Sequence, residues 1–431
     1  MDKLPGRLLP EWAALALVAM SFFVVLAFLC FFVFAARTPG LRKSVRGDFP
    51  QWMMAARLLR DAPDRLYDLE SQQRRFRNLH ETLETAGTAA AKTEGAKGGT
   101  TTKAVRYPYL YPPFVAAFFI PIVAAPFPLS FLVWAGISAI LYVGSVVILA
   151  PSHRRIVAVW LAFASPLFLW YTLVYGQLSA LACGAVAGAI FFERRGYPLL
   201  SGVALGLCVY KPTLLLWVIP MLFLGGRFRA LLGVCCTGSV LAAVSLGVAG
   251  WRACLDWFRL LFRWGNHVSI DGGKYPLAKF VDLNACTKMF TSQPKGVVFV
   301  LAAIVAAVSI IVTVRAWKGS IENRWAATLT LTLLVNVYAP MYDAVLLVLA
   351  ILVLWRPDNA RACAMFMIAV NLAAWWSEDL SRLGWPSPVT MVVFGFMLYQ
   401  GYLTSHPIQP RGTASDAGAV EASPLLQASP L

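Results

Sequence analysis

One carboxylate stands where a surface helix is expected to begin. The segment Arg46 to Trp52 reads Arg-Gly-Asp-Phe-Pro-Gln-Trp and follows the first long apolar run. After Asp48, apolar residues recur at helical spacing, which predicts a short amphipathic helix lying on a membrane surface. Two roles fit Asp48: aspartate is a favoured N-cap residue, and a carboxylate beside a substrate cavity can act as a general base.

Three further polar residues interrupt apolar runs, namely Gln177, Lys211 and Asp343. Polar and ionisable groups at membrane depth are costly, so each invites a functional hypothesis. The Lys211 ammonium either snorkels to the interface at a helix end or holds a lipid-linked phosphate. Gln177 either caps a helical hairpin or lines a cavity, and Asp343 either caps a helix or binds a sugar hydroxyl.

Several familiar catalytic motifs are absent from the sequence. It holds no HExxH, Walker loop, GxGxxG or placed nucleophile motif, and no DxD pair suited to a metal-bound nucleotide. The eight cysteines lack metal-ligand spacing. Cys254 and Cys286 share one expected outer loop, where a disulfide and two free thiols are both possible. The sequence therefore predicts no metal site, and it argues against a nucleotide-sugar donor.

The elements that must position these residues are membrane helices. The chain has 431 residues, of which 59% are hydrophobic and 13% are charged, whereas soluble domains carry about 25% charged residues. Apolar runs recur from residue 12 to residue 404, beginning with a run at 12–36 that we expect to be an uncleaved first helix. We predict an all-α polytopic membrane protein with about twelve crossings and both termini inside. The net charge of +16 fits cytoplasmic loops better than nucleic acid.

The distribution of basic residues predicts the topology. Five basic separators are expected to be cytoplasmic: 153–155, 194–195, 227–229, 315–324 and 356–361. The intervening polar segments then face outward with Asp48: 176–177, 211–212, 251–294, 338–343 and 378–385. The run at 114–125 is too short to cross and contains Pro121, so we expect it to be re-entrant or packed within protein.

We expect one transmembrane domain over 1–404. Its first outer loop, 37–112, carries the amphipathic helix and a flexible insertion at 86–104. Its second outer loop, 251–294, opens with an interfacial helix at 251–264 that has a tryptophan face and a basic face. Residues 405–431 are expected to form a disordered cytoplasmic tail.

The order of short motifs resembles glycosyltransferase family 87. These membrane transferases of the GT-C class include polyprenyl-phosphate-mannose-dependent α-mannosyltransferases, and the likeness runs over most of 10–404. Six elements carry it in order: D-F-x-x-W at Asp48 to Trp52, Y-D at Tyr67-Asp68, Y-P-P at Tyr111 to Pro113, G-Q at Gly176-Gln177, K-P at Lys211-Pro212 and Y-D at Tyr342-Asp343. The 86–104 insertion departs from the family pattern.

The resemblance implies a GT-C-like fold and a hexosyltransferase, with mannose the favoured sugar. A polyprenyl-phosphate-linked sugar would be the donor, an outer-face glycan or glycolipid the acceptor, and the displacement inverting, with no metal or other cofactor. The enzyme would be multi-pass in the plasma (inner) membrane, with its active site facing outward and with no nucleic-acid partner.

The same resemblance implies roles for individual residues. The loop acid that serves the family as proposed general base corresponds to Asp48. Lys211 would bind the donor phosphate, with Arg259 and Arg263 as weaker candidates. Five residues would line the substrate cavity: Tyr111, Gln177, Asn284, Tyr342 and Asp343. Asn284 matches an N-x-S element of the family in which Cys286 replaces the serine.

Two other classes of function stay open. A lipid-linked glycan flippase or polymerase, or another polytopic transporter, would also have many helices and a polar cavity. A flippase path would carry charged groups through both leaflets, whereas here they gather on one side. A non-enzymatic membrane scaffold would need no lysine or aspartate buried at the outer helix ends.

Overall fold

The computed structural model describes residues 47–88, 108–151, 155–266, 277–290 and 295–406. Within these ranges the regular secondary structure is helical, apart from one isolated antiparallel bridge between Phe280 and Pro340. The expected first helix, most of the 86–104 insertion and nearly all of the tail lie outside the described residues.

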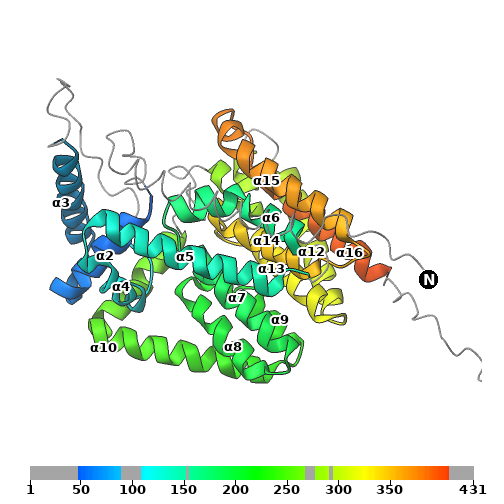
Figure 1. Ribbon diagram of the computed structural model, residues 1–431, viewed down its shortest axis with the longest axis horizontal. Helices are drawn as coiled ribbons and strands as arrows, with labels where there is room; N and C mark the ends of the chain where they lie inside the picture. Colours follow the sequence, from blue (N-terminus) through cyan, green and yellow to red (C-terminus); the bar gives the residue numbers. More distant parts are fainter. Residues whose placement is uncertain (1–46, 89–107, 152–154, 267–276, 291–294, 407–431) are drawn as a thin grey trace, which may run out of the picture.

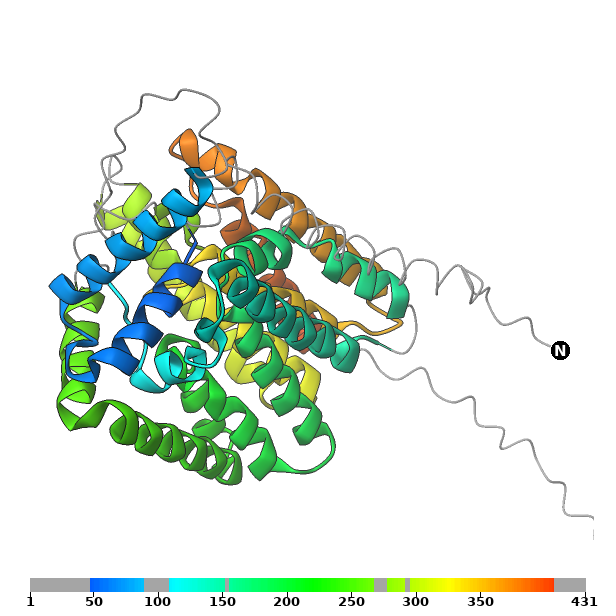
Figure 2. The same cartoon turned by 60° about the vertical axis from the view of Figure 1, so that its left-hand side comes forward.

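The segment expected to form the first outer loop contains two helices at one end of the molecule. These are α2 (Phe49–Asp61) and α3 (Leu69–Thr88), joined by the short 3-10 turn η3 (Pro63–Arg65). Figure 1 shows α2 and α3 on the opposite side from the bundle that contains α13 to α16, and Figure 2 brings these two helices to the front. α2 does not simply lie on a surface, as expected, but is packed into the protein, because its apolar side chains are buried there. It packs against α4 (Pro113–Phe119).

The remaining elements follow the expected apolar runs. In chain order they are η4 (Ile122–Ala124), α5 (Phe127–Leu149), α6 (Arg155–Phe163), η5 (Leu167–Val174), α7 (Ser179–Arg194), α8 (Pro198–Gly206), η6 (Leu207–Tyr210), η7 (Pro212–Leu214), α9 (Val218–Leu224), α10 (Phe228–Asn266), η9 (Leu277–Lys279), α11 (Leu283–Met289), α12 (Lys295–Ala316), α13 (Ile321–Leu334), η10 (Met341–Ala344), α14 (Val345–Leu354), α15 (Ala360–Arg382) and α16 (Pro388–Ser405).

Four described helices are long and apolar enough to cross a membrane. They are Phe127–Leu149, Phe228–Arg263, Gly296–Ala316 and Ala360–Ser377. A fifth crossing is possible if α6 and η5, which meet at a 45° bend, form one span. Length and composition therefore do not confirm the predicted twelve crossings, because many of the expected runs form helices too short to cross alone. The run at 114–125 contains only the short α4 and η4, as expected.

The second interfacial helix begins at a sharp break. Gly250, at φ 78° and ψ 167°, interrupts α10, a conformation that favours glycine. Figure 1 shows the first segment of α10 along the lower edge and the second turning up towards α4. In the second segment Trp257 is buried and donates to the Leu110 carbonyl at 2.9 Å. The break lies next to residue 251, where the second helix was expected to begin. The expected tryptophan face is not uniform, since Trp257 is buried and Trp251 is exposed.

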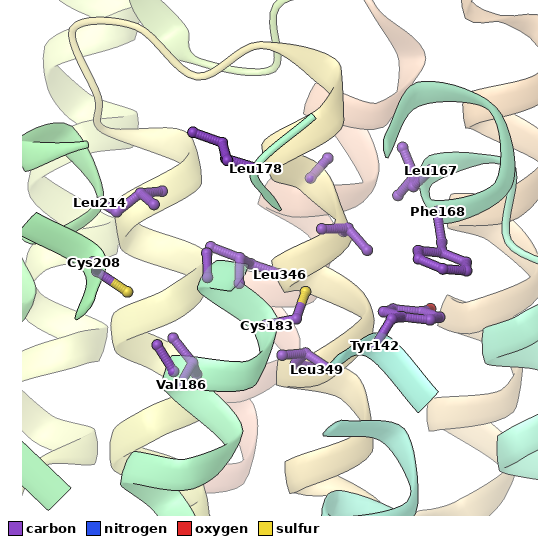
Figure 3. Packing of buried hydrophobic residues seen from close by; sticks show 14 of the residues in the cluster. Tyr142, Leu167, Phe168, Leu178, Cys183, Val186, Cys208, Leu214, Leu346 and Leu349 are labelled. Carbon is purple, nitrogen blue, oxygen red and sulfur yellow. The ribbon is translucent and has the colours of Figure 1, made fainter. Parts of the chain in front are cut away.

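The core surrounds α14, in which all ten side chains are buried. Such a helix is hydrophobic on every side. Figure 3 shows side chains from α5, η5 and α7 converging on it, with Cys183 of α7 beside Leu346 and Leu349. Tyr142 stacks on Phe168 with ring centroids 3.8 Å apart. This core fixes α7 and η5, the two elements on either side of Gln177.

α7 connects two polar clusters. Its first residue, Ser179, bonds Asp343. At its other end Glu193 lies 3.5 Å from Arg324, and Arg194 lies 3.1 Å from Glu322. With sixteen residues, α7 separates the two clusters by about 24 Å. The groups expected on the outer side and those expected in the cytoplasm thus gather at opposite ends of one helix.

Candidate functional site

Asp48 is held by a turn that lies more than a hundred residues later in the chain. Its backbone N–H donates to the Tyr175 carbonyl at 2.9 Å. A side chain at Gly47 would meet Tyr175, since an added Cβ would lie 2.7 Å from that carbonyl oxygen. Gly176 follows with φ +66°, and a Cβ there would lie 2.7 Å from that of Phe49. The two glycines therefore allow the start of α2 to press directly on this turn.

The turn at Tyr175 to Gln177 is also held by two tryptophan side chains. The Gly176 carbonyl accepts hydrogen bonds from the indole N–H groups of Trp52, at 2.8 Å, and Trp134, at 3.1 Å. The preceding η5 is a π-helix, a form that occurs often at functional sites. Trp52 comes from α2 and Trp134 from α5, so a single carbonyl oxygen joins three parts of the chain at the point where Gln177 begins.

The Asp48 carboxylate receives the Gln177 side chain and does not cap α2. Gln177 Nε2 donates to Asp48 Oδ2 at 2.6 Å, while Asp48 makes no side-chain capping bond. Asp68 does cap, because its Oδ2 accepts from the Ser71 N–H at 2.9 Å. Of the two roles left open for Asp48, the side-chain cap of α2 is therefore not formed, whereas Asp68 caps the next helix, α3. The Asp48 side chain is free to serve the site.

Burial raises the pKa of Asp48 above its usual value. The Gln177 hydrogen bond and the positive charge of Lys211 oppose this effect, because both stabilise the carboxylate. An acid whose pKa is raised towards neutrality accepts a proton more readily than an exposed aspartate does. The environment of Asp48 is thus suited to proton transfer.

A buried ion pair faces the same region. Lys211 lies between η6 and η7 and its ammonium pairs with Asp343 Oδ2, while Ser179 Oγ donates to Asp343 Oδ1 at 3.1 Å. Lys211 is 7% exposed and Asp343 is 2% exposed. The ammonium also lies 5.3 Å from the ring centroid of Tyr338 and 4.8 Å from that of Tyr342, so two aromatic faces stabilise its charge.

Aromatic side chains join the acid to the ion pair. Tyr111 lies against Trp52, with ring centroids 4.6 Å apart, and stacks on Tyr210 at 6.2 Å. The backbone carbonyl of Tyr111 accepts from the Tyr67 hydroxyl at 2.6 Å. The Y-D and Y-P-P motifs are thus in contact, and Tyr210 directly precedes Lys211.

The structure groups most of the residues expected in the site. Asp48, Tyr111, Gln177, Lys211, Tyr342 and Asp343 form one cluster, in which Asp48 and Asp343 both act electrostatically on the hydroxyls of Tyr111 and Tyr342. Asn284 instead contacts the segment before Tyr338, where its Nδ2 donates to the Val337 carbonyl at 3.1 Å.

The two arginines expected to assist with phosphate are not part of this grouping. Arg259 lies on the exposed side of α10, with its side chain 72% exposed, and pairs with Asp256 at 3.0 Å. Arg263 is also exposed. The structure therefore does not bring these side chains to Lys211. The possible disulfide is also not formed, because Cys254 and Cys286 are free thiols.

Three residues near the cluster were not singled out from the sequence. Ser179 bonds Asp343, and the ring of Tyr338 lies against the Lys211 ammonium. Asp282 holds the segment that carries Tyr338. Asp282 directly precedes Leu283, the first residue of α11, which is an N-cap signal. Nothing in the sequence indicated which distant segment it contacts. Within the described ranges no three His, Cys, Asp or Glu side chains converge as a metal site would require.

Comparison with known proteins decides the class. A family model described as Glycosyltransferase family 87 matches residues 109–342, just over half of the chain. The chain belongs to glycosyltransferase family 87. No curated protein and no solved structure matches it.

This family 87 protein is a glycosyltransferase with membrane-spanning helices. The matched range contains Tyr111, Gln177 and Lys211 and ends at Tyr342, one residue before Asp343. Asp48 lies outside it, so its inclusion in the site depends on its contacts with Tyr175 and Gln177.

Proposed function

We propose that this chain transfers a hexose, with mannose favoured, from a polyprenyl-phosphate donor to a glycan or glycolipid acceptor. The reaction takes place on the outer face of the plasma (inner) membrane, within a GT-C-like fold. The observation that carries the proposal is the partly buried contact of Gln177 Nε2 with Asp48 Oδ2, beside the Lys211–Asp343 pair. A base and a cation in one cluster are the two groups that an inverting displacement needs.

Asp48 is the general base in this mechanism. Its carboxylate takes the proton of the acceptor hydroxyl as that oxygen attacks the anomeric carbon of the donor sugar. The bond from the anomeric carbon to the phosphate oxygen breaks, and its electron pair leaves with the polyprenyl phosphate. Attack opposite the leaving group inverts the anomeric configuration, so no covalent intermediate with the protein forms.

Gln177 positions the base and meets the acceptor. Its Nε2 holds Asp48, while its Oε1 is buried and has no hydrogen-bond partner in the structure. A buried acceptor atom without a donor costs about 1–3 kcal/mol. A hydroxyl of the acceptor sugar supplies the missing donor and would be drawn to within reach of Asp48. Gln177 is 3% exposed, which keeps this contact away from bulk water.

Lys211 binds the donor phosphate. Its ammonium has three N–H groups, of which one bonds Asp343, so two remain for phosphate oxygens. The pair with Asp343 compensates the ammonium charge in a buried setting. As negative charge develops on the leaving phosphate, the fixed ammonium stabilises it. Because a lipid monophosphate leaves, and no nucleotide, the reaction as proposed requires no metal.

The test is transfer by purified protein. Reconstituted chain is incubated with a short-chain polyprenyl-phosphate-[14C]mannose and a disaccharide acceptor, and the product is analysed by chromatography. We expect a labelled trisaccharide of inverted anomeric configuration, formed equally in EDTA. Movement of the intact donor across the bilayer without a glycosidic product would contradict the proposal and indicate a flippase.

A further inference from the structure

The second outer loop is attached to the segment that forms one wall of the Lys211 site. Residues 335–340 join the end of α13 at Leu334 to the start of η10 at Met341 and are not helical. This short link carries Tyr338, whose ring lies beneath the Lys211 ammonium, and it leads directly to Asp343. A non-helical link of this kind needs external hydrogen bonds to be fixed.

Asp282 supplies two of those constraints at once. Its Oδ1 accepts from the Ala285 N–H at 2.8 Å and caps α11, while its Oδ2 accepts from the Ala339 N–H at 2.8 Å. The side chain is 1% exposed. Burial raises the pKa of Asp282 to about 6, so at neutral pH the carboxylate is ionised and both oxygens accept hydrogen bonds.

Neighbouring contacts reinforce the same attachment. The Val281 N–H donates to the Ala339 carbonyl at 2.9 Å, and Phe280 pairs with Pro340 in the isolated antiparallel bridge. The Phe280 and Tyr338 rings meet edge to face with centroids 5.0 Å apart. The second outer loop thus holds Tyr338 by both backbone and ring contacts.

The link is also held from the Lys211 side. Asn336 Nδ2 donates at 3.2 Å to the carbonyl of Thr213, which lies two residues after Lys211 in the chain. Asn336 Oδ1 accepts from the Tyr338 N–H at 3.1 Å. Tyr338 is therefore fixed between the lysine segment and the second outer loop. Asp282 is the one ionised side chain among these hydrogen-bond contacts, and bonds to charged groups are about twice as strong as neutral ones.

We propose that Asp282 is a positioning residue for donor binding, which acts by holding Ala339 and thereby keeping Tyr338 and Asp343 around the Lys211 ammonium. This inference rests on the proposed function of Lys211 in binding the donor phosphate. An Asp282 that only caps α11 would have no effect on the donor, since the cap bond goes to Ala285 alone.

Asp282→Asn separates the two roles. The amide oxygen keeps the cap on Ala285, because asparagine caps about as well as aspartate. The amide nitrogen then faces the Ala339 N–H, and two donors cannot bond. We expect the KM for the polyprenyl-phosphate-sugar donor to rise about tenfold with the acceptor KM unchanged. Asp282→Ala loses both bonds and is the comparison that reveals the contribution of the cap.

A second measurement tests the attachment without any transfer. Hydrogen exchange followed by mass spectrometry on the protein in detergent should show faster exchange in the peptide covering 336–340 of Asp282→Asn, with exchange in 283–289 unchanged. If exchange at 336–340 stays as in the wild type, the attachment is refuted whatever the activity. If it accelerates while the donor KM does not move in an active enzyme, positioning is refuted. A wild-type protein that transfers no sugar contradicts the proposed function, and the exchange result still decides the attachment.

Discussion

Gln177 and Asp48 lie 129 positions apart in the chain, yet Gln177 Nε2 is 2.6 Å from Asp48 Oδ2. The contact joins the start of α2 to the turn between η5 and α7. It leaves Asp48 Oδ1 without a bond to this amide and the amide oxygen of Gln177, Oε1, without a partner. An acid and an amide arranged in this way present two adjacent acceptor atoms, which a hydroxyl can approach.

Asp48→Asn should remove transfer and leave the fold intact. Asparagine keeps the size and polarity of the side chain but cannot accept a proton, and general-base catalysis contributes roughly 10²–10⁴-fold in rate. We therefore expect kcat to fall by about that factor, with little change in thermal stability. The measurement is initial-rate kinetics together with a thermal melt of the purified variant.

Asp68→Asn is the matched control for that substitution. Asp68 caps α3 through the Ser71 N–H and belongs to the same outer loop. Because asparagine preserves a cap, both activity and stability should stay near wild type. Equal loss of activity in the two variants would mean that any change in this loop impairs the enzyme, and Asp48 would lose its assigned role.

The pH dependence of transfer should report the surroundings of Asp48. Activity of a general base is lost as pH falls through its pKa, and burial places that pKa above the ordinary aspartate value. The Gln177 amide lowers the pKa by stabilising the carboxylate. Removing the amide in Gln177→Leu therefore raises the pKa, so the acid limb of kcat/KM should move to higher pH.

Gln400→Leu controls for the loss of a buried glutamine. Gln400 is buried, donates to Thr330 Oγ1 at 3.0 Å, and has an unpartnered Oε1, as Gln177 has. It lies on α16, outside the Asp48 cluster. Its replacement should leave the acid limb unmoved. A Gln177→Leu profile that coincides with that of Gln400→Leu would show that Asp48 is not the titrating base.

Local patterns were sufficient to predict the helices but not their number of crossings. The periodicity after Asp48 predicted α2, and the tryptophan and basic faces of 251–264 predicted the second segment of α10, because both patterns depend on neighbouring residues. Hydropathy could not distinguish a full span from a short helix buried in protein. α14 shows why: it is entirely apolar but only ten residues long, and other helices surround it.

The site was predicted in part for a similar reason. Gln177, Lys211 and Asp343 were found because a polar residue in an apolar run is conspicuous whatever it contacts. Their pairing was not predictable, since the Lys211–Asp343 and Gln177–Asp48 contacts arise from how distant helices pack. The exposed position of the arginines at 259 and 263 was not predictable either, because a helix has several faces, and Trp257 and Leu260, not the arginines, turn inward.

The Lys211–Asp343 pair should contribute differently to stability and to donor binding. Removing one partner leaves a buried charge uncompensated, which costs about 3–5 kcal/mol. Lys211→Met and Asp343→Leu should each lower the melting temperature, while the double variant should regain most of the loss, since an apolar pair of similar volume is often neutral. The donor KM should stay raised in the double variant because no ammonium remains for the phosphate.

Arg74→Gln is the comparison for that series. Arg74 and Glu70 form an exposed pair on α3 at 2.8 Å, and such pairs contribute less than about 1 kcal/mol. Neither stability nor donor KM should change measurably. Recovery of both stability and donor KM in the Lys211→Met/Asp343→Leu variant would show that the pair is purely structural.

Gly176→Ala should disturb the site more than its backbone conformation alone explains. A non-glycine residue in the left-handed region costs roughly 1–2 kcal/mol, and here the new Cβ would also lie 2.7 Å from Phe49 Cβ. α2 must then move away from the turn, which separates Asp48 from Gln177. Gly196→Ala is the control, because Gly196 has φ +77° but open space around its Cβ position. We expect a modest loss of stability in both variants, a further loss in Gly176→Ala, and reduced kcat in Gly176→Ala alone; equal kinetics would refute the coupling between this turn and the base.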